Sequence, residues 1–151
     1  MKKLKDIIRR LHKAKVLVIG DLILDEYIWG KVERISPEAP VPVVWADKRT
    51  HLPGGAANVA NNIRAYGADV YLSGIIGGDE NAARLILELK KNKIGTKGIF
   101  VEPNRHTTVK TRIIAGHQQV VRVDWEHTHD LTNEINAKIL KFIENSIDSF
   151  D

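Results

Sequence analysis

The chain has 151 residues, 43% of them hydrophobic, which is enough for one domain with a hydrophobic core and too few for two full domains. It contains no cysteine, so disulfides and thiolate metal sites are excluded, and we expect a reducing compartment, the cytoplasm. The net charge is +4, and no apolar run reaches the roughly 20 residues that cross a bilayer or forms the core of a signal peptide.

The excess positive charge lies at the N-terminus. Residues 1–15 hold seven Lys or Arg and one Asp, a charge of +6, which leaves −2 for the rest of the chain. An apolar stripe at helical spacing predicts an amphipathic helix whose basic side faces water: Leu4, Ile7, Ile8 and Leu11. No aromatic residue accompanies these charges, so we expect neither a nucleic-acid partner nor a membrane partner.

Residues 15–20 form an apolar run that ends in glycine, and this pattern predicts a central strand buried on both faces of a parallel sheet. Asp21 and Asp25 follow it, at the end of the sheet where open α/β folds bind their ligands. Their carboxylates suit sugar hydroxyls or a metal ion, and capping of a turn is the alternative.

Residues 26–50 are rich in β-forming side chains and contain three prolines between residues 35 and 42, which exclude a helix and a central strand there. We expect these strands to stand off the main sheet. Trp29 and Trp45 at strand edges indicate a partner or a covering flap. The alternative is that both indoles pack on the body of the domain.

The stretch from His51 to Gly67 predicts a flexible loop, a helix start and a helix stop in succession. Gly54 and Gly55 allow a ligand to approach the backbone, and the Asn58 amide in the first helical turn suits a polyhydroxylated ligand. The alternative is that small residues only let the helix pack closely on a sheet. The predicted buried face consists of Ala56, Val59, Ala60 and Ile63.

Residues 69–76 predict a second buried strand, followed by a helix that runs to about residue 92 and has Asp79 as its N-cap. Residues 107–114 and 118–124 predict a β-hairpin. Three cationic side chains on it suit a phosphate-bearing ligand, or are simply solvated: Lys110, Arg112 and Arg122.

Thr132 is the predicted N-cap of a last helix, and the chain ends where another strand is expected. The predicted buried face of this helix consists of Ile135, Ile139, Phe142, Ile143 and Ile147. Strands and helices alternate along the chain, which is typical of a wound α/β domain.

Four segments carry a resemblance to a known family: VLVIGDLILDEYIWG (16–30), RISPEAPVPVV (34–44), PGGAANVANNIRAYGADVYLSGIIGGDENA (53–82) and TTVKTRIIAGHQQVVRVD (107–124). Together they resemble the first half of the ribokinase-type (PfkB) carbohydrate kinases. More narrowly, they are similar to the D-glycero-β-D-manno-heptose-7-phosphate kinases of ADP-heptose synthesis, a step towards lipopolysaccharide.

The resemblance implies a ribokinase-like three-layer α/β sandwich with a protruding β-strand lid, of which residues 1–151 form the N-terminal portion. The lid strands fall at about 26–50 and 107–124 and imply a homodimer. The implied sugar-binding residues are Asp25, Gly54, Gly55 and Asn58, with Asp21 nearby. The two hairpin cations Lys110 and Arg112 complete the set of substrate-binding candidates.

The family reaction transfers the γ-phosphoryl group of ATP, with Mg²⁺, to a sugar hydroxyl; here the resemblance implies O1 of a heptose 7-phosphate. Family members supply the base and phosphoryl donors from a late Gly-Ala-Gly-Asp motif, and no such motif follows Asp124. Gly77-Gly-Asp79 lies in the wrong half to replace it. We therefore expect no catalytic residue in this chain, no strong binding of ATP or Mg²⁺, and completion by a separate C-terminal half. The alternative is a noncatalytic module that binds a sugar phosphate or dimerises.

Overall fold

The computed structural model describes residues 10–151, which form two β-sheets and three α-helices. The elements are η1 (Leu11–Lys13), β1 (Lys15–Ile19), β2 (Leu22–Ile35), β3 (Pro42–Gly55), α2 (Ala56–Ala65), β4 (Asp69–Ile76), α3 (Glu80–Lys91), β5 (Gly95–Val101), β6 (Thr108–Ala115), β7 (Gln118–Trp125), α4 (Asn133–Ser146) and η2 (Ile147–Ser149).

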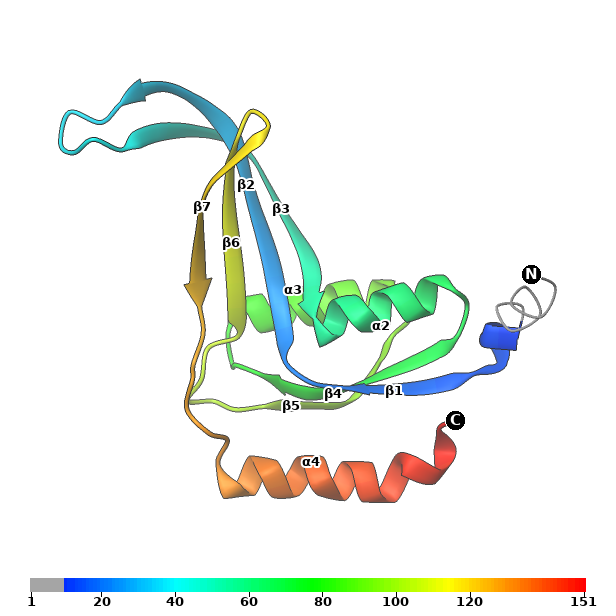
Figure 1. The fold of residues 1–151 in the computed structure, drawn as a ribbon. Helices are drawn as coiled ribbons and strands as arrows, with labels where there is room; N and C mark the ends of the chain where they lie inside the picture. Colours follow the sequence, from blue (N-terminus) through cyan, green and yellow to red (C-terminus); the bar gives the residue numbers. More distant parts are fainter. Residues whose placement is uncertain (1–9) are drawn as a thin grey trace.

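The first sheet is parallel, with strand order β1-β4-β5, and it lies between two helical layers. Figure 1 shows α2 and α3 on one face of this sheet and α4 on the other. We call this three-layer unit the body. The arrangement confirms the α/β sandwich expected from alternating strands and helices.

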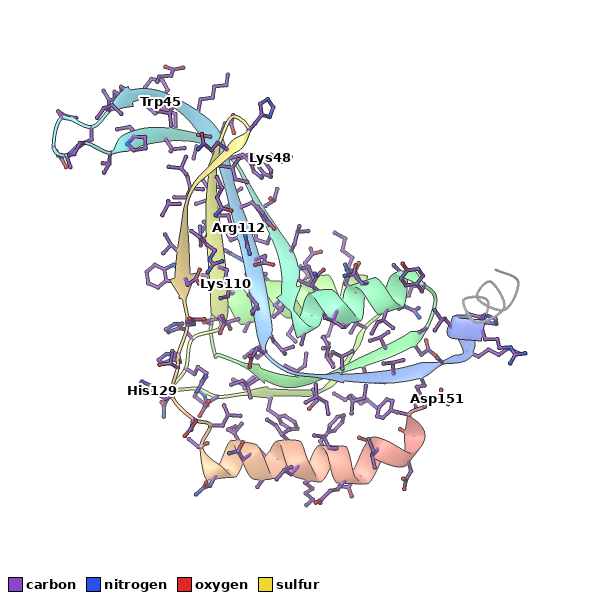
Figure 2. All side chains as sticks on the ribbon, in the orientation of Figure 1. Trp45, Lys48, Lys110, Arg112, His129 and Asp151 are labelled. Carbon is purple, nitrogen blue, oxygen red and sulfur yellow. The ribbon has the colours of Figure 1, made fainter. Side chains whose placement is uncertain are left out.

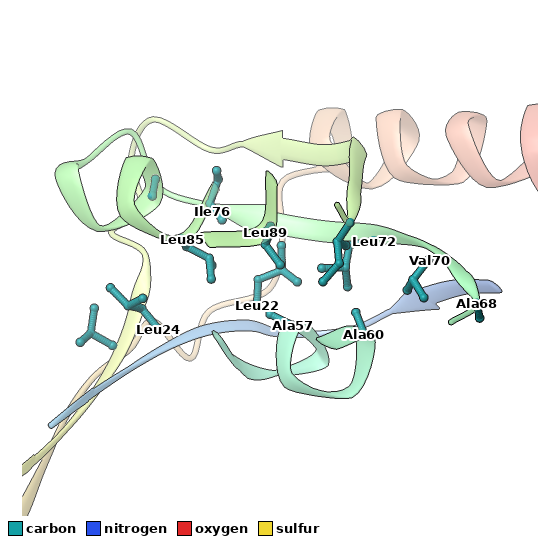
Figure 3. Close-up of a cluster of buried hydrophobic side chains, with 13 residues drawn as sticks. Leu22, Leu24, Ala57, Ala60, Ala68, Val70, Leu72, Ile76, Leu85 and Leu89 are labelled. Atoms are coloured by element: carbon teal, nitrogen blue, oxygen red, sulfur yellow. The ribbon is translucent and has the colours of Figure 1, made fainter. Parts of the chain in front are cut away.

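The core of the body lies between the sheet and the α2–α3 layer (Figure 3). Leu72, Leu85 and Leu89 are completely buried there, and each such leucine contributes about 1.5–3 kcal/mol relative to an exposed one. Ala57 and Ala60 let α2 approach the strands closely. The core extends to Leu22 and Leu24 at the start of β2, so it also anchors the second sheet.

The second sheet has strand order β3-β2-β6-β7 and stands off the body, as Figure 1 shows. We call it the lid, and its existence confirms the prediction for residues 26–50 and 107–124. The predicted bounds were too short, because β2 begins at Leu22 and β3 continues to Gly55.

The prediction of a flexible loop from His51 to Gly55 is wrong. These residues are the last part of β3 and pair with β2, with Gly54 opposite Ile23 and Gly55 opposite Leu22. The glycines allow close packing, because a Cβ on Gly54 would meet the Asp25 carboxylate and a Cβ on Gly55 would meet the Asp21 carbonyl. The helix starts immediately afterwards at Ala56, as predicted.

The prediction that β1 is central and buried on both faces is also wrong for the described residues. It pairs with β4 alone, and Ile19 is 52% exposed. The backbone N–H of Asp151 donates to the Lys15 carbonyl at 3.0 Å, so the end of the chain lies beside this strand.

The predicted helix boundaries are confirmed at three positions. Asp79 and Thr132 accept hydrogen bonds from the third residue of α3 and α4, and Gly67 has a φ of +95° just after α2. Two predicted core positions are wrong: Val59 and Ile147 are each 49% exposed. The buried face of α2 is rotated by a fraction of a helical turn from the predicted one, so Ala57 is buried and Val59 is not.

The predicted N-terminal helix falls on residues 1–9, outside the described part of the chain, apart from Leu11 in the short η1. Strand β5 was not predicted, because its sequence GTKGIFV has neither alternation nor a continuous apolar run. Within residues 10–151, no helix is both long and apolar enough to span a bilayer.

Candidate functional site

The candidate site lies on one face of the lid, close to where the lid joins the body. Along β2, Leu22, Leu24 and Glu26 are buried, whereas Asp25 and Tyr27 point to the other face because side chains alternate along a strand. Asp25 is the fourth residue of β2. Figure 2 shows Arg112 and Lys110 along the lid, with His129 near its base.

Asp25, Gly54 and Arg112 form a compact group that we call the Asp25 site. An Arg112 Nη1–H donates to Asp25 Oδ1 at 2.6 Å, although the two residues are 87 positions apart in sequence. The guanidinium also lies 5.3 Å from the Tyr27 ring centroid, which fixes its orientation. The hydrogen bond to the Asp25 carboxylate raises the pKa of Arg112, so the guanidinium stays charged.

Gly54 makes the position of Asp25 possible. A Cβ on Gly54 would lie 2.5 Å from Asp25 Oδ2, closer than any side chain tolerates. The carboxylate thus rests against the β3 backbone, with Oδ1 engaged by Arg112 and the remaining lone pairs available to a hydroxyl group. Such an arrangement can bind a polyol at a defined angle.

Gly55 and Asn58 lie at the start of α2, shortly after Gly54 of the Asp25 site in the sequence. Gly55 has a φ of +55°, and a Cβ there would lie 2.5 Å from the Asp21 carbonyl. That carbonyl accepts a hydrogen bond from the Ala56 N–H at 2.9 Å, which ties the β1–β2 turn to the helix start. The Asn58 side chain is exposed in the first turn.

Asp21 and Lys110 line one pocket of about 200 Å³ at the base of the lid. The Lys110 Nζ lies 3.2 Å from Asp124 and 3.5 Å from Glu126, so its charge is already compensated. Asp21 also lines a second pocket, of about 410 Å³, that lies towards Asn136 and Ile139 of α4. The two pockets share Asp21 and adjoin at the carboxyl ends of β1 and β4.

Sequence reasoning missed the residues that separate these pockets. Arg105 and His127 line both, and His106 lines the first. Arg105 donates to the carbonyls of His127 and His129 at 3.3 and 2.6 Å and so holds the β7–α4 connection in place. Two short motifs in the sequence could have indicated them: Arg105-His106 just before the predicted strand at 107–114, and His127-Thr-His129 just after the predicted strand at 118–124.

Arg105 is itself fixed by Glu102. Its Nε lies 2.9 Å from Glu102 Oε2, and the two largely buried side chains form an ion pair. Asp79 gives further support at this end of the site. Its carboxylate accepts from the Thr107 N–H at 2.7 Å and the Thr107 hydroxyl at 2.8 Å.

Burial alone would raise the pKa of Asp79, but these bonds and the N–H of Ala82 outweigh it and hold the pKa below its usual value. An anionic Asp79 therefore joins α3 to the beginning of β6. It has a structural role, in agreement with the prediction that it caps the helix.

The sequence pattern of the pfkB family of carbohydrate kinases matches residues 13–146. The chain belongs to this family. As a pfkB protein it has relatives called bifunctional protein HldE: that of Helicobacter pylori (strain HPAG1) is 50% identical over 137 residues, which is 91% of this chain and 30% of the relative. The HldE of Pelobacter propionicus is 42% identical over 150 residues, 99% of this chain and 31% of the relative.

Solved structures agree on the fold of this pfkB chain. A carbohydrate kinase from Agrobacterium tumefaciens gives a TM-score of 0.61 at 21% identity, covering 74% of this chain and 35% of that one. The ribokinase of Arabidopsis thaliana complexed with ribose and ATP gives 0.58 at 18% identity, covering 74% and 36%. The fold is thus ribokinase-like, and the chain spans about 30% of the length of its HldE relatives.

Of the seven site residues predicted from sequence, the structure brings Asp25, Gly54 and Arg112 into contact and places Asp21 and Lys110 in one pocket. Gly55 and Asn58 lie at the adjacent helix start, where Gly55 packs against the Asp21 carbonyl and Ile23 and the Asn58 side chain is exposed. No three His, Cys, Asp or Glu of residues 10–151 are arranged to hold a metal ion.

Proposed function

We propose that this chain supplies the sugar-binding half of an ATP-dependent carbohydrate kinase that phosphorylates a heptose 7-phosphate at O1 in ADP-heptose synthesis. The observation that carries the proposal is the 42–50% identity to bifunctional HldE proteins over almost the whole chain. The narrower motifs RISPEAPVPV and QQVVRVD, which resemble the heptose kinases, support the substrate class.

The roles of the residues follow from their chemistry. Asp25 accepts hydrogen bonds from sugar hydroxyls, Arg112 orients its carboxylate, and Gly54 lets the carboxylate approach the β3 backbone. Asp21 and Asn58 complete the hydroxyl-binding side, and Lys110 stands beside the neighbouring pocket. Gly55 shapes the turn from β3 into α2.

The groups that act on the phosphoryl group are proposed to come from another polypeptide segment, because no Gly-Ala-Gly-Asp motif follows Asp124 in these 151 residues. ATP and Mg²⁺ belong to the completed enzyme, with Mg²⁺ held mainly by the nucleotide phosphates. We further propose a cytoplasmic location, where ATP and sugar phosphates are available.

Calorimetry with the purified chain tests the proposal. We expect D-glycero-D-manno-heptose 7-phosphate to bind and ATP with Mg²⁺ to give no measurable heat in the absence of the sugar. Fructose 6-phosphate is the matched control, since it carries a phosphate on a different sugar. Equal binding of both sugars, or of neither, would contradict a heptose site.

A second candidate is a noncatalytic dimerisation module. It is favoured by the outer part of β2 and β3, residues 31–45, which extends beyond the other lid strands (Figure 1) and which we call the arm. The arm exposes Val32, Ile35, Val41 and Trp45 by 40–61%. Heptose binding in the calorimetric experiment favours the kinase half over this candidate.

A further inference from the structure

Three imidazoles gather at the base of the lid, and we call them the histidine cluster: His106, His127 and His129. His106 lies in the β5–β6 connection, and the other two lie in the β7–α4 connection. The ring centroids of His106 and His127 are 4.1 Å apart, and those of His127 and His129 are 5.9 Å apart. Two connections distant in sequence thus present their rings to the same place.

The imidazoles are the uncommitted donors of the site. Within residues 10–151 the ring nitrogens of the cluster make no hydrogen bond or ion pair. The other cations nearby are already paired: Arg105 with Glu102, Lys110 with Asp124 and Glu126, and Arg112 with Asp25. A new ligand at this end of the site therefore meets imidazole N–H groups first.

The backbone around the cluster is held rigidly. Arg105 fixes the carbonyls of His127 and His129, and the Asp79–Thr107 contacts fix the chain just after His106. Gly77 packs so tightly here that a Cβ would lie 2.3 Å from the Arg105 carbonyl. Donors on such a fixed frame bind an anion without a large ordering cost.

The cluster faces a pocket of suitable size and composition. His106 and His127 line the pocket of about 200 Å³ that also holds Lys110 and Thr108. This volume is below that of ordinary small-molecule sites, so it suits one polar group of a ligand rather than the whole ligand. The three rings do not meet in a metal-binding geometry.

The two ends of the site differ in hydrogen-bonding character. Asp25 offers acceptors, which match sugar hydroxyls, whereas His106 and His127 offer donors, which match phosphate oxygens; Asp21 lines the same pocket as the two imidazoles. Glu126 also lines the pocket, and Lys110 lies between it and Asp124. A ligand with hydroxyls at one end and a phosphate at the other fits this polarity.

We propose that His106 and His127 bind the phosphate group that the sugar substrate already carries, with Lys110 beside it. The identity of the sugar phosphate rests on the proposed function, whereas the phosphate site itself rests on the histidine cluster and its pocket. Partial burial and the neighbouring His106, Arg105 and His129 lower the pKa of His127, so near neutral pH its ring is mainly uncharged and donates one N–H. A phosphate dianion at the edges of the two rings can accept an N–H hydrogen bond from either form.

The test is NMR of ¹⁵N-labelled chain titrated with heptose 7-phosphate, the unphosphorylated heptose and inorganic phosphate. We expect the imidazole signals of His106 and His127 to shift with heptose 7-phosphate and with inorganic phosphate. The unphosphorylated heptose is expected to shift only backbone signals around Asp25 and Gly54. His106→Gln and His127→Gln should each weaken heptose 7-phosphate binding about tenfold.

His117→Gln is the matched control, because His117 lies in the β6–β7 turn at the far end of the lid. It should leave every affinity unchanged. Backbone spectra of the three variants check that each fold is intact. The imidazole shifts of the unaltered chain test the inference even if a variant misfolds.

The outcomes separate this inference from the proposed function. If the heptose and its 7-phosphate bind with equal affinity and the imidazole signals stay still, the phosphate site is wrong and the sugar site stands. If inorganic phosphate shifts the imidazole signals but neither sugar binds, the phosphate site stands and the heptose substrate is wrong. If no ligand shifts the imidazole signals, the inference is overturned.

Discussion

Asp25 illustrates how a single residue combines structural and binding chemistry. Its side chain is 19% exposed and is paired with Arg112, and a buried charge of this kind is costly unless it has such a partner. The pairing uses one carboxylate oxygen and leaves acceptor capacity on the other, next to Gly54. The same contact therefore joins β2 to β6 and leaves the carboxylate oriented for the hydroxyl-binding role that we propose.

We predict that Asp25→Asn weakens heptose 7-phosphate binding to the chain at least about tenfold, or roughly 1.4 kcal/mol. The amide keeps the shape but loses the charge and converts one acceptor into a donor. Calorimetry measures the effect, and Asp47→Asn on the exposed part of β3 is the matched control. Unchanged affinity with a lowered melting temperature would make Asp25 purely structural.

Glu26 lies on the opposite face of β2 and is 5% exposed. Burial by itself would raise its pKa, but hydrogen bonds from Arg49, Thr111 and His51 outweigh that effect and hold the pKa below the usual 4.5. The folded state therefore favours the carboxylate. The resulting stabilisation is complete above pH 4.5 and is lost as the pH falls through the lower folded-state pKa.

We predict that Glu26→Gln lowers the free energy of unfolding at pH 7 by about 1–3 kcal/mol, because charge-assisted bonds within the sheet are lost. Its unfolding free energy should also fall less steeply than that of the unaltered chain when the pH drops below 4.5. Urea titrations at several pH values measure both effects. Glu144→Gln, on the exposed side of α4, serves as the control, and parallel pH curves for Glu26→Gln would disprove the role of Glu26.

At the scale of elements, the arm is the part of the lid that the chain itself does not cover. Beyond Gly30 neither β2 nor β3 has a further strand partner among the described residues, and Trp45 is 54% exposed. Strand edges with exposed apolar side chains are prone to association. A second copy of the arm would cover both the edges and the indole.

We predict that the chain is a dimer at micromolar concentration. Trp45→Lys should raise the dissociation constant of this dimer at least about tenfold, since a charge replaces the aromatic side chain that the second copy covers. Sedimentation velocity measures the change. Leu140→Lys on α4 alters an equally exposed apolar residue outside the arm and should leave the dimer intact. A monomeric unaltered chain, or equal effects of both variants, would exclude the arm as the interface.

At the scale of the whole molecule, the residues proposed to bind the sugar lie on the lid and where the lid joins the body, beside two pockets. The chain spans about 30% of the length of its HldE relatives, and β1 has a free edge beside Asp151 among the described residues. Phosphoryl transfer needs a base, donors for the transferred group and a bound nucleotide together. The Gly-Ala-Gly-Asp motif that supplies the first two in the family does not occur after Asp124 in these 151 residues.

We predict that the purified chain does not form ADP from ATP and heptose 7-phosphate above a protein-free control. A coupled ADP assay with Mg²⁺ measures this, and a full-length HldE relative is the positive control. Turnover that depends on the sugar would require a base within residues 1–151 and would return Asp79 to consideration, with Asp79→Asn as the deciding variant.

The amino-acid sequence by itself determined the features that depend on neighbouring residues. Caps at Asp79 and Thr132, the stop at Gly67 and the turn at Gly116 follow from hydrogen bonds and φ angles within a few positions. The apolar runs and prolines were enough to predict the order of the strands and helices, apart from β5, and the strands that stand off the main sheet. The four segments that resemble the pfkB kinases were enough to predict the family.

The tertiary structure alone decided which distant groups meet. The Asp25–Arg112 pair spans 87 positions, and the histidine cluster joins two connections. The pairing of β3 with β2 turned the expected flexible loop at His51–Gly55 into strand. Local patterns cannot fix such contacts, because they depend on strand register and on the direction in which each connection returns to the sheet. The uncommitted imidazoles at the lid base become visible only once those pairings are known.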